Sequence, residues 1–221
     1  MNLIENETLS GEMLEPASGS DPRQLIIFLH GVGSDGEDLI ALAPMMTERF
    51  PDALFLSPNA PEPCDMAPMG FQWFSLRNWS HEAMLKGAQG SAPILNAFID
   101  QQIKEHDLKA ENVALVGFSQ GTMMALYTAL RRKEPLGAVV GFSGAMVGSE
   151  ELEYELKSKT PVCLIHGNAD PVVPFEAMAI AEAALKELDV PVETHIRENL
   201  AHGIDAEGIE AAMVFVQKHL K

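Results

Sequence analysis

The stretch "VALVGFSQGTMMAL", residues 113–126, joins an apolar, β-branched segment directly to an apolar segment with helical character. Strands and helices are ordinarily joined by short loops, yet here only Gly117-Phe118-Ser119-Gln120-Gly121 separates the two. The G-x-S-x-G pattern in this context predicts a strained strand-to-helix turn, in which glycine flanks allow close packing without a Cβ clash. Ser119 is therefore predicted to project above the carboxyl edge of a sheet, facing the N-terminus of the following helix.

The same pattern has a purely structural interpretation, in which the glycines only close a tight turn between strand and helix. The apolar strand before it and the helix after it favour the nucleophile interpretation, because the catalytic motif requires both. A similar segment, "GFSGA" at 141–145, has its second glycine one place early. Ser143 is therefore predicted to end a strand rather than to act as a nucleophile.

The rest of the chain alternates between two kinds of apolar pattern. Short apolar runs bounded by turn residues occur at 25–30, 53–56, 113–117, 137–142, 161–166 and 192–196. Most of them are continuous rather than alternating, which is typical of strands buried on both faces of a parallel sheet. Segments with helical period occur at 37–49, 80–106, 120–132, 175–188 and 206–220. This alternation predicts an α/β fold, a mostly parallel doubly wound sheet with helices on both faces. Residues 1–22 are less regular and are compatible with an antiparallel edge hairpin, and residues 1–221 are expected to form one domain.

Composition excludes several classes of function. Lys and Arg number 15 against 32 Asp and Glu, which gives a formal net charge of −17. Such a surface repels phosphate backbones and anionic lipid heads, so neither nucleic acid nor a stably bound membrane is an expected partner. No apolar run approaches the ~18 residues of a membrane span, and the N-terminus lacks a signal-peptide pattern. Cys64 and Cys163 form no C-x-x-C pair and are expected to be reduced, in a cytoplasmic protein.

A nucleophilic serine needs a base and an acid that orients the base. In hydrolases of this type the acid and then the histidine follow the serine along the chain. Asp170, in "IHGNADPVVP", comes directly after the predicted 161–166 strand, at the same sheet edge as Ser119. The alternative role for Asp170 is to cap the helix that starts near Phe175.

Seven histidines compete for the role of base. His202, in "NLAHGID", follows the last predicted strand and precedes the last helix, so it combines the required order with a loop at the active edge. The other six fall at strand ends, in helices or within a strand: His30, His81, His106, His166, His195 and His219.

The sequence also predicts an oxyanion hole. One amide would come from Gln120, the residue after the nucleophile, and one from Val32 in the glycine-rich loop "FLHGVGSDGEDL". The rival interpretation of residues 31–36 is a dinucleotide fingerprint, since they match G-x-G-x-x-G. It is disfavoured because no acidic residue ends a second strand about 20 residues further on.

Residues 57–79 have neither helical nor strand period and are rich in proline, methionine and aromatic residues. A long irregular loop in a compact domain is often functional. Its apolar side chains are predicted to line a substrate groove beside Ser119, with methionines adapting to different acyl chains: Met66, Met69, Phe71, Trp73 and Phe74. The alternative is a hydrophobic cluster that pins the loop to the domain.

Six motifs in order make the chain resemble the phospholipase/carboxylesterase family of α/β hydrolases, which includes acyl-protein thioesterases and small bacterial carboxylesterases. They are "LHGVGSDGEDL", "PNAP", "QWF", "GFSQG", "HGNADPVVP" and "AHG", and the match spans about residues 23 to 220. The resemblance implies a Ser119–Asp170–His202 triad, an oxyanion hole at Val32 and Gln120, no metal and no organic cofactor. It also implies a fold without a large cap domain, with the acyl chain near residues 57–79.

Two positions depart from the family's usual pattern. Ser75 stands where the family often has Asp, and Thr122 stands where it often has a second glycine. The expected function is a serine esterase acting on small-molecule carboxylic esters, acyl thioesters or lysophospholipids. A non-catalytic α/β-hydrolase scaffold that binds a ligand or a partner is the alternative. The sequence leaves open whether the chain forms a homodimer.

Overall fold

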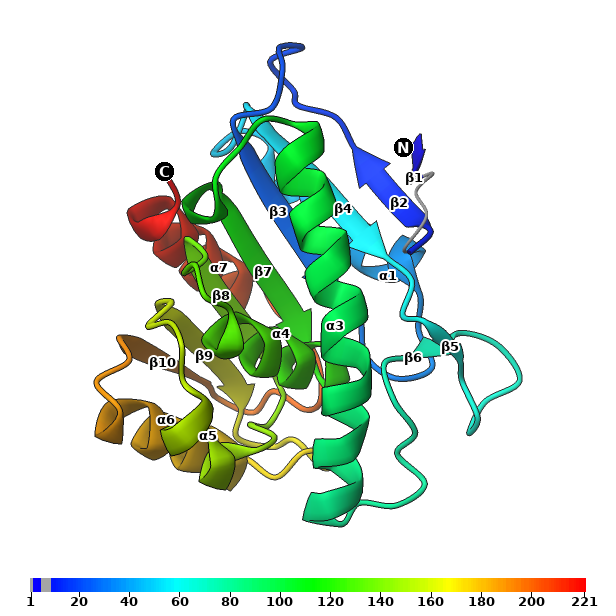
Figure 1. The fold of residues 1–221 in the computed structure, drawn as a ribbon, viewed down its shortest axis with the longest axis vertical. Helices are drawn as coiled ribbons and strands as arrows, with labels where there is room; N and C mark the ends of the chain where they lie inside the picture. Colours follow the sequence, from blue (N-terminus) through cyan, green and yellow to red (C-terminus); the bar gives the residue numbers. More distant parts are fainter. Residues whose placement is uncertain (1, 5–8) are drawn as a thin grey trace.

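The computed structural model describes residues 2–4 and 9–221, which build an eight-stranded sheet covered by helices on both faces (Figure 1). The central strands β3, β4 and β7 to β10 are parallel, whereas β1 and β2 pair antiparallel at one edge. Across the sheet the order is β1 (Asn2–Ile4), β2 (Gly11–Leu14), β4 (Ala53–Pro58), β3 (Gln24–Leu29), β7 (Val113–Phe118), β8 (Ala138–Phe142), β9 (Val162–Gly167) and β10 (Val192–Arg197). The predicted α/β fold is confirmed, and β1 and β2 form the expected antiparallel edge, although residues 1 and 5–8 lie outside the described residues.

Each central strand contributes alternate side chains to two hydrophobic cores. Leu25, Ile27 and Leu29 of β3 belong to one core, and Ile26 and Phe28 belong to the other. Because both faces are buried, the strand appears in the sequence as one unbroken apolar run.

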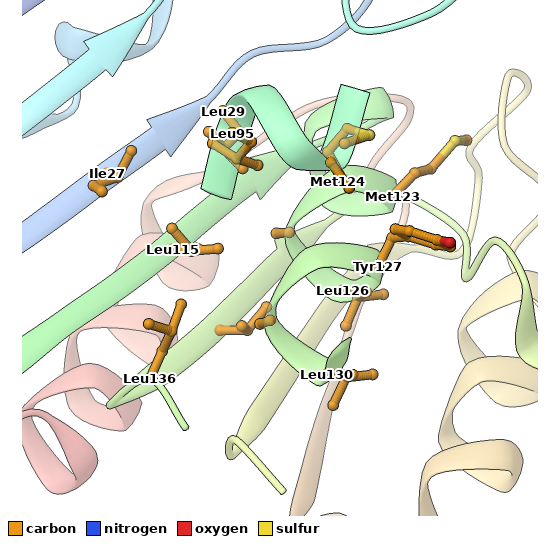
Figure 2. Close-up of a cluster of buried hydrophobic side chains, with 14 of the residues drawn as sticks. Ile27, Leu29, Leu95, Leu115, Met123, Met124, Leu126, Tyr127, Leu130 and Leu136 are labelled. Carbon is orange, nitrogen blue, oxygen red and sulfur yellow. The ribbon is translucent and has the colours of Figure 1, made fainter. Parts of the chain in front are cut away.

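The first core lies beneath α3 (His81–Glu105), α4 (Gln120–Arg131), α5 (Ser149–Glu155) and α6 (Glu176–Glu187), and the second beneath α1 (Gly36–Ile40), α2 (Ala43–Met46) and α7 (Ala206–His219). Figure 2 shows α4 lying over the sheet, with the strand residues Ile27 and Leu115 and the helix residues Met124, Leu126 and Leu130 drawn as members of one core.

Two helical predictions need correction. The single helix expected over 37–49 is divided into α1 and α2, because Pro44 has no N–H to donate back to the preceding turn. The short α5 was not predicted, since Leu152 is the one fully buried residue among its seven and no apolar period is visible. A 3₁₀ turn at Ala110–Asn112 leads from α3 towards β7.

Residues 57–79 continue from β4 into an irregular connection that contains a two-stranded ribbon, β5 (Glu62–Pro63) and β6 (Phe71–Gln72). The ribbon is fastened to the glycine-rich loop, because Gly33 N donates to Phe71 O (2.8 Å) and Phe71 N donates to Ser34 O (2.8 Å). The described part of the chain contains no large cap domain over the carboxyl edge of the sheet. None of its helices is both long and apolar enough to cross a membrane.

Candidate active site

Ser119 occupies a sharp turn between the end of β7 and the start of α4. Its backbone has φ 53° and ψ −115°, a conformation that residues other than glycine rarely adopt. The flanking glycines are a steric requirement: a Cβ on Gly121 would lie 1.8 Å from Leu29 O, and one on Gly117 would lie 2.5 Å from the Gly121 backbone. The predicted turn is therefore present, with Ser119 at the carboxyl edge of the sheet.

Asp170 and His202 meet at this edge. His202 Nδ1 lies 2.7 Å from Asp170 Oδ2, and the Asp170 side chain is fully buried whereas that of His202 is 17% exposed. The imidazole packs against the Phe118 ring at a tilt of 44°, with ring centroids 4.8 Å apart, and Phe118 is the residue directly before Ser119. Because Nδ1 donates to the carboxylate, Nε2 keeps its lone pair and can act as a base.

Backbone hydrogen bonds between two loops bring the acid and the histidine together. Asn168 N donates to Arg197 O (3.0 Å), and Ala169 N donates to Leu200 O (3.1 Å). The Asn168 side chain adds a third link, since its Oδ1 accepts from Asn199 N (2.8 Å). The loop after β9 and the loop after β10 thus form one unit that carries both side chains.

The surroundings of Asp170 keep its carboxylate ionised. Burial by itself would raise its pKa, but the hydrogen bond from His202 and the amides of Val172 and Val173 outweigh burial, so the pKa is lowered. These amides donate to Oδ1 at 2.8 and 3.0 Å. Asp170 does not cap α6, whose N-cap residue Phe175 has no side-chain capping bond. His166 Nε2 lies 3.2 Å from Asp170 Oδ2 and 3.1 Å from Val173 O, and so helps to shape this loop.

The glycine-rich loop lies against the serine turn, as an oxyanion hole requires. A Cβ on Gly31 would approach the Ser119 Cβ to 3.3 Å, so Val32 directly follows a point of close contact with Ser119. Gln120 is the first residue of α4, and its amide therefore belongs to the helix N-terminal N–H groups that lack an intrahelical acceptor. Of the two predicted donors, Gln120 directly follows Ser119, and Val32 directly follows Gly31, which is in contact with Ser119.

The Gln120 side chain has a second role that the sequence did not reveal. It is fully buried, and both ends of its side-chain amide form hydrogen bonds with the 57–79 region. Its Oε1 accepts from Trp73 N (3.0 Å) and its Nε2 donates to Phe74 O (2.7 Å). Trp73 is further held by Ser91, whose hydroxyl donates to Trp73 O, and by His30 O, which accepts from the indole N–H (3.0 Å). The sequence signal for this role was limited to a glutamine placed between Ser119 and the apolar run of α4.

The five apolar residues predicted to line a substrate groove are not brought together. Trp73 (0% exposed) and Phe74 (3% exposed) belong to the hydrophobic core, as the structural alternative predicts. Phe71 is partly buried against the same core, whereas Met66 and Met69 are 50% and 80% exposed. Of the predicted groove residues, the two methionines are therefore the ones an incoming substrate can reach most readily.

Both departures from the usual family pattern have local partners. Ser75 Oγ donates to Asp65 Oδ2 (2.6 Å), so Asp65 supplies a carboxylate beside position 75. This hydrogen bond is the main reason why the pKa of Asp65 is lowered. The Thr122 hydroxyl lies 2.9 Å from both Gly117 O and Phe142 O.

Thr122 also fits sterically where a second glycine is common. A Cβ on Gly141 would lie 2.5 Å from Thr122 Cγ2, and a Cβ on Gly144 would lie 2.4 Å from Thr122 Cβ. These two glycines therefore make room for the Thr122 side chain beneath the serine turn.

Comparison with known proteins agrees with this architecture. Residues 15–220 match the phospholipase/carboxylesterase family. The crystal structure of esterase PE8 superimposes with a TM-score of 0.92 at 43% sequence identity, covering 96% of this chain and 100% of that one. Esterase YpfH of Escherichia coli is 29% identical over 191 residues, which are 86% of this chain and 81% of the relative.

Acyl-protein thioesterase 1 of Saccharomyces cerevisiae is similarly related. It is 29% identical over 214 residues, which are 90% of this chain and 93% of the relative. With this fold and a match over nearly its whole length, the chain is a hydrolase and belongs to the phospholipase/carboxylesterase family of α/β hydrolases.

Proposed function

We propose that this protein is a serine esterase that cleaves carboxylic ester bonds through Ser119, His202 and Asp170. The observation that carries the proposal is the 2.7 Å contact between His202 Nδ1 and the buried Asp170 carboxylate, at the sheet edge where Ser119 is held in a strained turn. A nucleophile, a base and an acid in this arrangement are the components of acyl transfer.

In the proposed reaction His202 Nε2 takes the proton of the Ser119 hydroxyl as Ser119 Oγ attacks the acyl carbon. The amides of Val32 and Gln120 donate to the oxyanion that develops on the carbonyl oxygen. His202 then delivers its proton to the leaving alcohol, and an acyl-enzyme remains on Ser119. Water, activated by His202, repeats the attack and releases the carboxylic acid.

Asp170 contributes by remaining charged throughout this cycle. Its lowered pKa means that the carboxylate stays ionised and stabilises the imidazolium that forms on His202. The bond to Nδ1 also fixes the tautomer, so that the lone pair is on Nε2.

The class of acyl substrate is proposed from the relatives of the chain and from the exposed side chains of residues 57–79. Relatives named esterase and acyl-protein thioesterase support carboxylic esters and acyl thioesters as the substrate classes. The exposed side chains of Met66 and Met69 offer adaptable apolar surface to an acyl chain, and their chain neighbours Ala67 and Gly70 lie near Gly33 of the glycine-rich loop. Lysophospholipids are a further candidate, because they join an ester to such a chain.

Variants of the proposed base and acid test the mechanism. His202→Ala and Asp170→Asn should each lower kcat for 4-nitrophenyl butyrate by several orders of magnitude, because the base is removed or held in the wrong tautomer. His195→Ala, in the edge strand β10, is the matched control and should leave kcat unchanged. Wild-type turnover in His202→Ala, or a loss confined to His195→Ala, would contradict the proposal.

The same turnover assay distinguishes the proposed esterase from a non-catalytic scaffold. A scaffold would bind ligands without turning over any ester in a panel of increasing acyl length that includes an acyl thioester and a lysophospholipid.

A further inference from the structure

The end of β8 is attached to the nucleophile. Phe142 O accepts a hydrogen bond from Ser119 N (2.9 Å) and lies 2.9 Å from the Thr122 hydroxyl. The backbone of the serine turn is thus fixed by the last residue of the neighbouring strand.

The next residue, Ser143, reaches in the other direction. Its hydroxyl donates to Gly203 O (3.3 Å), and Gly203 directly follows His202. Ser143 is 1% exposed and Gly203 is partly buried, so the donor side of this bond is shielded from water. Its own amide donates to Ile165 O (2.9 Å) and thereby fixes Ser143 to β9.

The loop that carries His202 has few other attachments at this point. Among the described residues, the hydrogen bonds that reach residues 201–204 are the one between His202 and Asp170 and the one from Ser143 to Gly203. A Cβ on Gly203 would meet nothing within 4 Å, whereas the flanking residues His202 and Ile204 pack against Phe118 and the second core.

The backbone of Ser143 supports a role for its hydroxyl. Its φ of 46° is in the left-handed region, where glycine would be unstrained and serine is not. Ser143 is thus strained in a position that would suit glycine, and its side chain makes a hydrogen bond to the loop that carries His202.

We propose that Ser143 is a positioning residue that holds His202 in register with Ser119, through the adjacent bonds at Phe142 and Ser143. The inference rests on the proposed function, because it assigns His202 as the base. It gives the second serine motif, "GFSGA", a role distinct from that of the nucleophile.

Two substitutions separate the hydroxyl from the backbone. Ser143→Ala and Ser143→Gly both remove the hydrogen bond, but glycine also relieves the strained φ. Both should lower kcat by roughly ten-fold, the loss expected for one hydrogen bond that positions the base, with KM unchanged. If the position acts through its backbone alone, Ser143→Gly will keep the kcat of the wild type, which would overturn the proposal.

Ser158→Ala is the matched control. Ser158 is also buried and its hydroxyl also donates to a backbone carbonyl, Ala129 O (2.8 Å), after α5 and outside the catalytic loops. Its removal should lower the melting temperature but leave kcat unchanged. A loss of kcat in Ser158→Ala equal to that in Ser143→Ala would show that only general stability had changed.

A proton NMR spectrum provides a readout that a purely structural role would not change. The low-field resonance of the His202 Nδ1 proton, assigned by its absence in His202→Ala, should broaden or shift in both Ser143 variants and not in Ser158→Ala. An unchanged resonance together with unchanged kcat would refute the positioning role. If His202→Ala is inactive while both Ser143 variants are fully active, this inference fails and the proposed function stands.

Discussion

At the scale of single residues, His30 shows how buried polar groups define the active edge. Ala60 N donates to its Nε2 (2.9 Å), so the ring proton is on Nδ1 and is donated to Gly31 O (2.7 Å). Burial lowers the pKa of His30, and the opposing effects of the Gly31 bond and of Asp35 and Asp38 are smaller. Protonation would break the bond from Ala60 and place a charge beneath the glycine-rich loop.

This assignment predicts an acid-sensitive contribution to stability. In the unfolded chain His30 takes up a proton near its ordinary pKa of about 6.5, whereas in the folded chain it does so only at lower pH. The unfolded state therefore binds more protons in this window, and the free energy of unfolding falls as the pH decreases from about 7.5 to 5. The contribution is fully present above the unfolded pKa.

Urea unfolding across this pH range, followed by tryptophan fluorescence, measures the effect. His30→Gln should have a smaller pH dependence than the wild type, whereas His81→Gln, at an exposed position, should match the wild type. Equal slopes for His30→Gln and the wild type would show that His30 is not the responsible group.

Residues with local signals could be predicted, and those defined by distant partners could not. Ser119, Asp170 and His202 are marked by motifs and chain order, and the structure places Asp170 and His202 in contact. Gln120 contacts Trp73 across 47 residues and Ser143 contacts Gly203 across 60, and no pattern in the sequence indicates either pair. The exposure of individual side chains within residues 57–79 could not be predicted either. Met69 and Trp73 are both large and apolar, yet Met69 is exposed and Trp73 is buried.

At the scale of elements, α4 is held close to the sheet by the glycine at its second position. Its residues are buried from Gln120 to Leu130, and Gly121 approaches the end of β3. The helix and strand predictions succeeded here because both apolar runs are long and the glycines at 117 and 121 mark the turn between them. They were wrong at 37–49, where a proline divides a continuous apolar period.

Two glycine substitutions test this packing. Gly121→Ala would place a Cβ 1.8 Å from Leu29 O, a backbone atom that cannot move aside alone, and should lower the free energy of unfolding by more than about 3 kcal/mol or prevent folding. Gly90→Ala, in α3, meets nothing within 4 Å and should raise it by about 0.5–1 kcal/mol. Thermal and urea unfolding measure both, and a tolerated Gly121→Ala would contradict the described approach of α4 to β3.

At the scale of the whole molecule, the dominant property is the formal net charge of −17. Charge of one sign repels like-charged ligands over distances set by the Debye length, about 8 Å at physiological ionic strength. The protein should therefore select against anionic substrates even where their acyl groups fit the site.

A pair of esters with the same acyl chain, one with a neutral and one with a sulfonated leaving group, tests this selection. Raising the salt concentration should increase kcat/KM for the anionic ester and leave the neutral ester nearly unchanged, because salt screens the repulsion. The same salt response for both esters would show that net charge does not govern access.

The central claim, that Ser119 is the nucleophile of an acyl-transfer site, is tested most directly by covalent labelling. A fluorophosphonate incubated with the folded wild-type protein should add one group per chain, located by peptide mass spectrometry on Ser119, and Ser119→Ala should take up none. Labelling that persists in folded Ser119→Ala, or that maps to Ser143 in the wild type, would contradict the account.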